Sequence, residues 1–309
     1  MTKNCFILYG PTASGKSRIA YELAETLPIE IINMDSVQVF KDFNIGAAKP
    51  DQAILNTIPH HLIDIVSVPD HFSVATYLDK LNECLTTIHS KGKIPMLVGG
   101  TMLYLNAIVK GGLSDIPSID ESLRLSIMET LDILTQKQKY DLLITVDPTW
   151  AKQIHPHDRQ RTVRGLLVYF ATSKPLSSYT TLNSSFLFNP KLMALDGFDR
   201  SWLHNQIDLR AEAMVEAGLI EEVIELIRKH PKDLDHFAFR SIGYKQVIDM
   251  INKDYSLALL KEHIKAATRQ FAKRQITWMK HHQPDLVIKP NDYSIIKIKE
   301  WTISHSNCG

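Results

Sequence analysis

The sequence predicts an α/β fold, in which a parallel β-sheet is flanked by helices and interrupted by a mostly helical insertion. Short apolar runs alternate with stretches of helical periodicity in the N-terminal third of the chain. This alternation is typical of parallel sheets. A phosphate-binding pattern follows the first apolar run, and a change of composition near residue 114 marks the start of the insertion.

Each expected strand is a short apolar run that ends in turn residues, as buried parallel strands do. These runs lie at residues 5–9, 29–32, 61–65 and 94–98, and a later run at 191–197 returns to the sheet. A helix is expected after the first run, because Ile19, Leu23 and Leu27 repeat at helical spacing. Residues 74–90 form another clear helical stretch.

The chain divides into a core and an insertion. Gly, Pro and Ser cluster over residues 111–122, helical patterns follow to about residue 172, and a polar loop spans 172–185. We therefore expect a core formed by residues 1–113 and 191–309, with a helical C-terminal part, and an insertion over 114–190.

Composition and charge exclude several classes of protein. The net charge is +1, so the chain as a whole implies no polyanionic partner. Its three cysteines, Cys5, Cys84 and Cys308, are far apart and build no disulfide framework or zinc spacing. No apolar run approaches the ~18 residues of a membrane span. We expect a cytoplasmic protein with no membrane partner, and a monomer.

The stretch GPTASGKS matches the phosphate-loop pattern G-x-x-x-x-G-K-[ST]. Glycines let the backbone N–H groups point at phosphate oxygens, the lysine adds positive charge, and the serine can ligate Mg²⁺. A strand before it and a helix after it stand where the motif needs them, so the sheet is expected to be P-loop NTPase-like. The residues expected to bind the phosphates of a ligand, whether a diphosphate or a nucleotide, are Gly10, Pro11, Thr12, Ala13, Ser14, Gly15, Lys16 and Ser17.

Acidic residues near the strand ends are few. The run 94–98 ends in Gly99, Gly100 and Thr101 without a carboxylate, although phosphoryl transfer usually needs an acid there. Asp35 follows the run 29–32, at the edge where α/β sheets place ligands. A small-molecule or nucleotide kinase stays possible, with Asp64 as its second magnesium carboxylate.

Two basic segments point to a phosphate backbone as partner. Arg159, Arg161 and Arg164 lie close together in IHPHDRQRTVR, and a stripe near the C-terminus has helical spacing. The stripe contains Lys261, Lys265, Arg269 and Lys273. Phe271 and Trp278 lie elsewhere on that helix and are expected in the core. With a phosphate loop, these segments favour binding of a polyanion.

Seven segments in order resemble those of the tRNA dimethylallyltransferases, also called tRNA isopentenyltransferases. Besides the phosphate loop, the resemblance rests on INMDSVQVFKDFNIGAAKP, PHHLIDI, PMLVGGTMLYL, IHPHDRQRTVR, GYK and ATRQFAKRQITWMK, and it covers nearly the whole chain. His157, Gly165 and Leu167 depart from the family pattern, which has Asn, Ala and Glu there. The absence of a C-terminal Cys/His finger is similar to the bacterial type.

The resemblance implies a reaction. A dimethylallyl group would pass from dimethylallyl diphosphate to N6 of adenosine 37 in tRNA, with release of pyrophosphate. Asp35 would be the general base. Lys16, Thr12 and Arg210 would stabilise the leaving group, and Ser17 would ligate Mg²⁺, the expected cofactor.

The resemblance also implies contacts with the anticodon stem-loop, whose target base must flip out of its stack. The insertion would clamp the RNA. The implied tRNA-binding residues are Asp35, Ser36, Val37, Gln38, Thr101, Arg124, Gln160, Arg161, Thr162, Val163, Arg164, Arg240, Ser241, Ile242, Gly243, Tyr244 and Lys245.

Two further alternatives stay open beside the kinase. A non-catalytic RNA-binding module would lose no activity in Asp35→Ala. An enzyme that prenylates free adenine nucleotides would need no stem-loop surface, and competition between AMP and tRNA would separate it.

Overall fold

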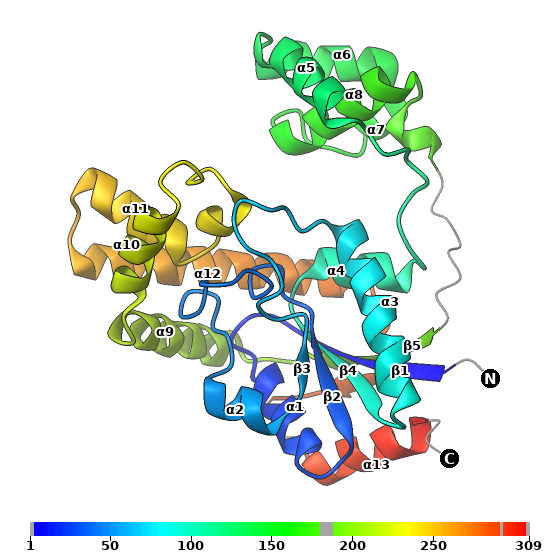
Figure 1. The fold of residues 1–309 in the computed structure, drawn as a ribbon, viewed down its shortest axis with the longest axis vertical. Helices are drawn as coiled ribbons and strands as arrows, with labels where there is room; N and C mark the ends of the chain where they lie inside the picture. The colour runs from blue at the N-terminus through cyan, green and yellow to red at the C-terminus, as the bar shows by residue number, and fades with distance from the viewer. Residues whose placement is uncertain (1–2, 180–187, 291–292, 307–309) are drawn as a thin grey trace. The chain divides into compact units, whose positions relative to one another are not determined.

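The computed structural model describes residues 3–179, 188–290 and 293–306. Its centre is a six-stranded sheet in the order β3-β2-β4-β1-β5-β6, and every pair of neighbours is parallel. The strands are β1 (Lys3–Tyr9), β2 (Ile29–Asn33), β3 (His60–His61), β4 (Ile94–Gly99), β5 (Phe188–Leu195) and β6 (Leu286–Ile288). This confirms the predicted α/β class with a parallel sheet flanked by helices (Figure 1).

The helices of the sheet-containing part cover both faces of the sheet and extend beyond it (Figure 1). They are α1 (Lys16–Ala24), α2 (Gln52–Thr57), α3 (Val74–Ser90), α4 (Met102–Val109), α9 (Arg200–Glu216), α10 (Leu219–Lys229), α11 (Tyr244–Lys253), α12 (Leu257–Met279) and α13 (Ile295–His305). A short 3₁₀ turn spans Phe237–Arg240. No helix in the described ranges is long and apolar enough to cross a membrane.

Strand β1 is buried on both faces, as its unbroken apolar run predicts. Ile7 and Tyr9 belong to one core cluster, which α3 and α4 cover. Phe6 and Leu8 point into a second cluster with α1 and α13. The alternation of side chains along one strand therefore builds a core on each face of the sheet.

One predicted strand is mostly wrong. The run 61–65 contributes only its first residue to β3, because the backbone leaves the extended region directly afterwards. Leu62 has φ 61° and Asp64 has φ 56°, conformations that end pairing with β2. Strand β5 begins at Phe188 and ends at Leu195, so it starts earlier and ends earlier than the predicted run 191–197.

A third cluster packs α9, α10, α11 and α12 against the segment that follows β2. Val39, Phe40 and Phe43 from that segment are buried against Leu219 and Tyr244. This packing matters for the site, because it attaches the loop after Asp35 to helices that are far away in the sequence.

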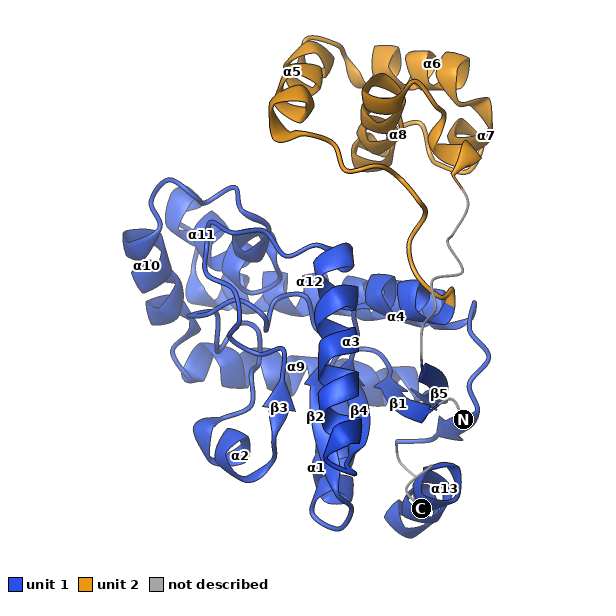
Figure 2. Cartoon of the chain, turned by 45° about the vertical axis from the view of Figure 1, so that its right-hand side comes forward, with its two compact units in different colours: residues 1–109, 186–309 blue, residues 110–185 orange. Residues whose placement is uncertain are grey.

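The chain separates into two compact units (Figure 2). The second unit, Lys110–Ser185, contains α5 (Glu121–Asp132), α6 (Gln136–Val146), α7 (Pro148–Ala151), α8 (Arg159–Thr172) and a 3₁₀ turn at Leu176–Ser178. The insertion predicted over 114–190 contains the same helices. The end of the polar loop predicted over 172–185, and Cys308, lie outside the described residues.

Packing inside the second unit explains two departures from the family pattern. Gly165 lies on α8 where a Cβ atom would stand 2.7 Å from Leu143 Cδ1 and 2.9 Å from Trp150 Cδ1. Leu167 is buried on the same helix. Gly165 and Leu167 therefore suit the packing of α8 within the second unit.

Candidate active site

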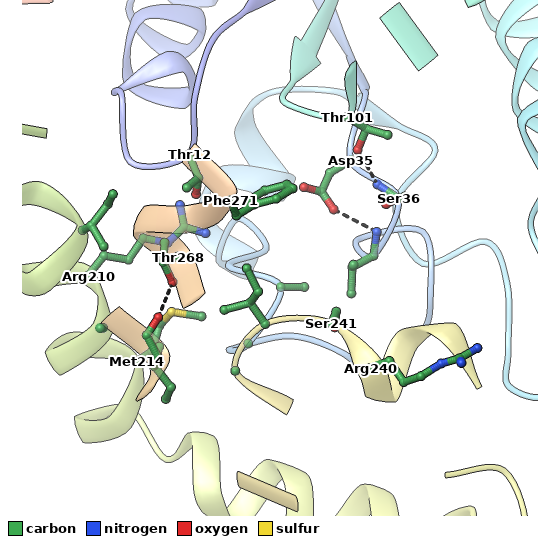
Figure 3. A pocket seen from close by; sticks show the side chains of 18 of the residues that line it. Thr12, Asp35, Ser36, Thr101, Arg210, Met214, Arg240, Ser241, Thr268 and Phe271 are labelled. Carbon is green, nitrogen blue, oxygen red and sulfur yellow. Dashed lines mark hydrogen bonds between the residues drawn. The ribbon is translucent and has the colours of Figure 1, made fainter. Parts of the chain in front are cut away.

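The carboxyl ends of β1, β2 and β4 converge, and each is followed by a predicted site residue. Thr12 follows β1, Asp35 follows β2 and Thr101 follows β4. All three line one cavity of about 340 Å³, here called the chamber. Figure 3 shows their side chains around it, together with that of Arg210 from α9. Parallel strands place their ligand sites at this edge.

The phosphate loop has the conformation that its glycines suggest. Gly15 has φ 89°, which favours glycine, and α1 begins at the next residue, Lys16. The Lys16 ammonium donates a hydrogen bond to the carbonyl oxygen of Pro11 at 2.6 Å, so the side chain folds back over the loop. The loop thus combines a helix N-terminus with a cation, an arrangement that attracts phosphate.

Lys16 and Arg210 place two positive charges near Asp35. The pKa of Lys16 is lowered to about 7, first by burial and then by the charge of Arg210, while Asp35 acts in the opposite direction. Burial also lowers the pKa of Arg210, and Asp35 again opposes the shift. An anion bound beside both cations would be strongly favoured, because it would offset their repulsion.

Asp35 is held by the backbone that follows it. Its Oδ1 accepts hydrogen bonds from the N–H groups of Val37 at 2.8 Å and Gln38 at 3.4 Å. No described residue hydrogen-bonds to Oδ2, and the residue lines the chamber. One carboxylate oxygen is therefore fixed while the other can accept a proton from a ligand.

The rest of the segment after Asp35 is ordered by hydrogen bonds from other loops. Thr101 Oγ1 accepts from the N–H of Ser36 at 3.1 Å. The Gln38 amide donates to the carbonyl oxygens of Ala47 and Ala48, each at 3.1 Å. Gly46 and Ala47 form part of the chamber lining. The predicted residues Asp35, Ser36, Val37 and Thr101 line it too, whereas the amide nitrogen of Gln38 is used by the protein itself.

Another part of the chamber lining comes from the segment between the 3₁₀ turn and α11. Arg240, Ser241, Ile242 and Gly243 line the chamber as a group. Lys245 is exposed and does not line it. Tyr244 is buried at 0% exposure, and its hydroxyl contacts Glu222 and Ala47. The RNA contact predicted for the Tyr244 side chain is therefore corrected, because this residue packs inside the protein.

Helix α12 contributes chamber residues that the sequence analysis missed. Phe271, Thr268 and Arg274 line the chamber. Phe271 was instead expected in the core. That expectation failed because helical periodicity does not distinguish a core face from a chamber face. Trp278 does pack against the core, as expected.

The sequence model of the IPP transferase family matches residues 38–282. The chain belongs to this family. Among its relatives, the tRNA dimethylallyltransferase of Legionella pneumophila (strain Corby) is 42% identical, and the alignment covers 91% of this chain and 90% of that protein. That of Neisseria meningitidis serogroup A is 39% identical, covering 94% and 93%.

Solved structures of the same family have a similar fold. The full-length tRNA isopentenylpyrophosphate transferase from Bacillus halodurans has a TM-score of 0.70 and 31% identity, covering 98% of this chain and 96% of that one. A eukaryotic dimethylallyltransferase described as acting on tRNA has a TM-score of 0.75 and 26% identity, covering 93% and 74%. The fold is that of a P-loop NTPase-like IPP transferase.

The basic stripe of this IPP transferase is largely neutralised within the protein. Lys261 and Lys265 form ion pairs with Glu212 of α9, and Arg269 pairs with Asp208 at 2.5 Å. The stripe was predicted to face a phosphate backbone, and that interpretation is wrong for these three residues. Sequence spacing identified a charged helix face but not the acidic helix packed against it.

In the second unit, the predicted RNA contacts differ in exposure. Gln160, Arg161 and Arg164 are exposed on α8, and Arg124 is exposed on α5. Thr162 is buried at 0% exposure, and its hydroxyl donates to the carbonyl oxygen of Asp158, so its side chain is structural. Val163 is half-buried against the core of the unit.

Arg124 and Arg164 are two exposed cations of the second unit that lie near each other. Although Arg164 as a residue is exposed, its guanidinium is partly surrounded by protein, and this desolvation, followed by the charge of Arg124, lowers its pKa. Among the residues that the structure describes, Arg124 forms an ion pair with the exposed Glu121 on its own helix, at 2.8 Å. Repulsion between these neighbouring cations would fall if an anion bound to both.

Proposed function

We propose that this chain transfers a dimethylallyl group from dimethylallyl diphosphate to N6 of adenosine 37 in tRNA and releases pyrophosphate. The observation that carries the proposal is the chamber itself. Thr12 of the phosphate loop, Arg210 and the carboxylate of Asp35 all line it, and the charges of Arg210 and Asp35 both act on the neighbouring Lys16. Membership of the IPP transferase family supports the same reaction.

The donor fits the chamber and the phosphate loop beside it in two parts. Its diphosphate lies against residues Gly10 to Ser17, where backbone N–H groups, Lys16 and Arg210 carry positive charge. Its five-carbon chain lies along an apolar wall. That wall is formed by Ile207, Ala211, Met214, Ile264 and Phe271.

The reaction exchanges one bond for another. The N6 amine of the flipped adenine attacks the first carbon of the dimethylallyl group, a C–N bond forms, and the C–O bond to the diphosphate breaks. Asp35 Oδ2 accepts the proton that N6 loses. Lys16, Arg210 and the Thr12 hydroxyl, which lines the chamber, stabilise the charge on the leaving pyrophosphate.

The donor set of this site fits Mg²⁺. Ser17, on the first turn of α1, is exposed, and no cluster of acidic, His or Cys metal ligands exists among the described residues. Mg²⁺ takes oxygen ligands, and at a phosphate loop the Ser or Thr hydroxyl is one of them, with phosphate oxygens and water completing the shell. Ser17 would hold it, and the ion would neutralise charge on the diphosphate.

The acceptor is proposed to be a tRNA anticodon stem-loop. Asp35, Ser36, Val37, Gln38 and Thr101 would surround the flipped base. Arg240 to Gly243 and Lys245 would contact the RNA near the chamber, with Tyr244 supporting them from inside. Arg124, Gln160, Arg161 and Arg164 would bind it from the second unit, whose role would be that of a clamp.

The kinase alternative is not favoured. It needs Asp64 as a carboxylate for a second magnesium ion, but Asp64 forms an ion pair with Lys49 and does not line the chamber. A vestigial RNA-binding module is less consistent with an intact loop and Lys16. Prenylation of free AMP would leave the exposed arginines of the second unit without a partner.

One experiment tests the proposal. Purified protein is mixed with Mg²⁺, unmodified tRNA carrying adenosine 37, and either dimethylallyl diphosphate or ATP, and the digested nucleosides are weighed by mass spectrometry. We expect dimethylallyl-adenosine only with the prenyl donor, and its loss in Asp35→Ala and Lys16→Ala. Formation of ADP without that nucleoside would contradict the proposal. In a second assay AMP competes with tRNA for the donor, and equal prenylation of the two would indicate that the free nucleotide is the acceptor.

A further inference from the structure

Gln275 is a buried amide between the two loops that hold the substrates. It lies on α12 and is 3% exposed. Its Oε1 accepts a hydrogen bond from the backbone N–H of Thr12 at 2.8 Å, and its Nε2 donates to the carbonyl oxygen of Gly100 at 2.8 Å. One side chain thus joins the phosphate loop to the loop after β4.

The atoms around Gly100 leave no room for a side chain at this position. A Cβ atom at Gly100 would lie 2.4 Å from Gln275 Nε2 and 3.2 Å from the carbonyl oxygen of Gly10. The ends of β1 and β4 therefore meet around this amide. An amide can serve both loops with one side chain, whereas a carboxylate cannot donate to a carbonyl and an ammonium cannot accept from an N–H.

A short path of hydrogen bonds leads from this amide to Asp35. Thr101 follows Gly100 directly, and its hydroxyl accepts from the N–H of Ser36. Ser36 is the neighbour of Asp35, whose carboxylate is fixed by Val37. In the other direction, Thr12 belongs to the phosphate loop and lines the chamber. The amide links the donor's loop to the segment that carries the general base.

We propose that Gln275 is a positioning residue that sets the distance between the diphosphate loop and Asp35, so that donor carbon, base nitrogen and proton acceptor are aligned. The inference rests on the proposed function, because it concerns the same two substrates. Gln275 does not line the chamber, so it acts through Thr12 and Gly100. Alignment of this kind affects the chemical step more than binding.

Two variants of similar size test the idea. Gln275→Met keeps the length of the side chain and removes both hydrogen bonds. Gln275→Glu keeps the acceptor for Thr12 but removes the donor to Gly100. The matched control is Gln270→Met, the same change at an exposed position of the same helix.

The measurements are kcat, KM for dimethylallyl diphosphate, KM for tRNA, and amide hydrogen exchange. For Gln275→Met we expect kcat to fall roughly a hundredfold, with both KM values within about threefold of the parent. Exchange should become faster in peptides covering residues 10–17 and 99–102 and unchanged elsewhere. Gln275→Glu should lose a similar factor in kcat, and Gln270→Met should match the parent.

Several outcomes would overturn the inference. Unchanged kcat with faster exchange throughout the chain would mean that Gln275 only stabilises the fold. A rise in either KM with kcat unchanged would make it a binding residue. Unchanged exchange at residues 10–17 would also contradict it, even if the parent protein formed no prenylated tRNA, since exchange does not depend on the reaction. A parent without product but with the expected exchange would reject the proposed function alone.

Discussion

The hydroxyl of Tyr244 donates a hydrogen bond to Glu222 Oε1 at 2.7 Å and accepts one from the N–H of Ala47 at 3.1 Å. The same carboxylate accepts from the N–H groups of Asn44, Ile45 and Gly46. A Cβ at Gly46 would stand 2.4 Å from the Tyr244 ring. Through one tyrosine and one glutamate, α10 and α11 thus hold residues 44–47, of which Gly46 and Ala47 line the chamber.

Tyr244→Phe should loosen this segment. The change leaves the buried N–H of Ala47 without an acceptor, a loss of about 1–3 kcal/mol in the free energy of unfolding. Because Gly46 and Ala47 line the chamber, KM for tRNA should also rise. Urea denaturation and steady-state kinetics measure the two effects.

Tyr255→Phe is the control for this prediction. The Tyr255 hydroxyl donates to the carbonyl oxygen of Gln246 and does not line the chamber. The Tyr255→Phe substitution should lower the free energy of unfolding without changing KM for tRNA. An unchanged free energy of unfolding in Tyr244→Phe would contradict the role given to its hydroxyl.

Asp35→Asn should separate chemistry from structure. The side-chain oxygen that remains can still accept from Val37, so the local fold should persist, but the proton acceptor is lost. We expect kcat to fall by roughly 10²–10⁴ with tRNA affinity retained, measured by single-turnover prenylation and by filter binding. Full activity would mean that another group accepts the N6 proton.

Donor binding should depend on the protonation of Lys16. In the free protein its pKa is about 7, so above pH 7 the side chain is mostly neutral. A bound diphosphate favours the charged form, so binding above pH 7 takes up a proton, and affinity should fall roughly tenfold per pH unit well above 7. Below pH 7 this dependence should disappear.

Calorimetry in two buffers of different ionisation enthalpy would measure this uptake for dimethylallyl diphosphate without tRNA. Lys16→Met is the control, because any proton uptake that this variant still shows comes from the ligand or from other groups of the protein. Equal proton uptake by the parent and by Lys16→Met would disprove the role of Lys16.

The arginines of the second unit and the lysines of α12 should differ in their effect on RNA binding. Arg164→Ala should weaken binding of the anticodon stem-loop and reduce the slope of log affinity against log salt by about 1. Lys265→Ala should leave that slope unchanged, because Lys265 is paired with Glu212. Fluorescence anisotropy at several salt concentrations measures both, and the reverse order would restore the basic stripe as an RNA surface.

Much of the core could be predicted from sequence, because its signals are local. An apolar run followed by GPTASGKS specifies a buried strand, a glycine-dependent turn and a helix N-terminus within residues 5–24. The run at 61–65 failed for a local reason as well, since the positive φ values of Leu62 and Asp64 are not visible in apolar composition. Strand β6 was not predicted, as its three residues carry too weak a pattern.

The α/β class, the phosphate loop, the family resemblance and Asp35 as an acid after a strand could all be predicted from the sequence. Which charges face a ligand could not, because each depends on a partner distant in the chain. Arg269 meets Asp208, Tyr244 meets Glu222, and Gln275 meets Thr12 and Gly100. Helical spacing identifies a face, but the helix packed against that face determines whether its side chains bind RNA, line the chamber or hold the protein together.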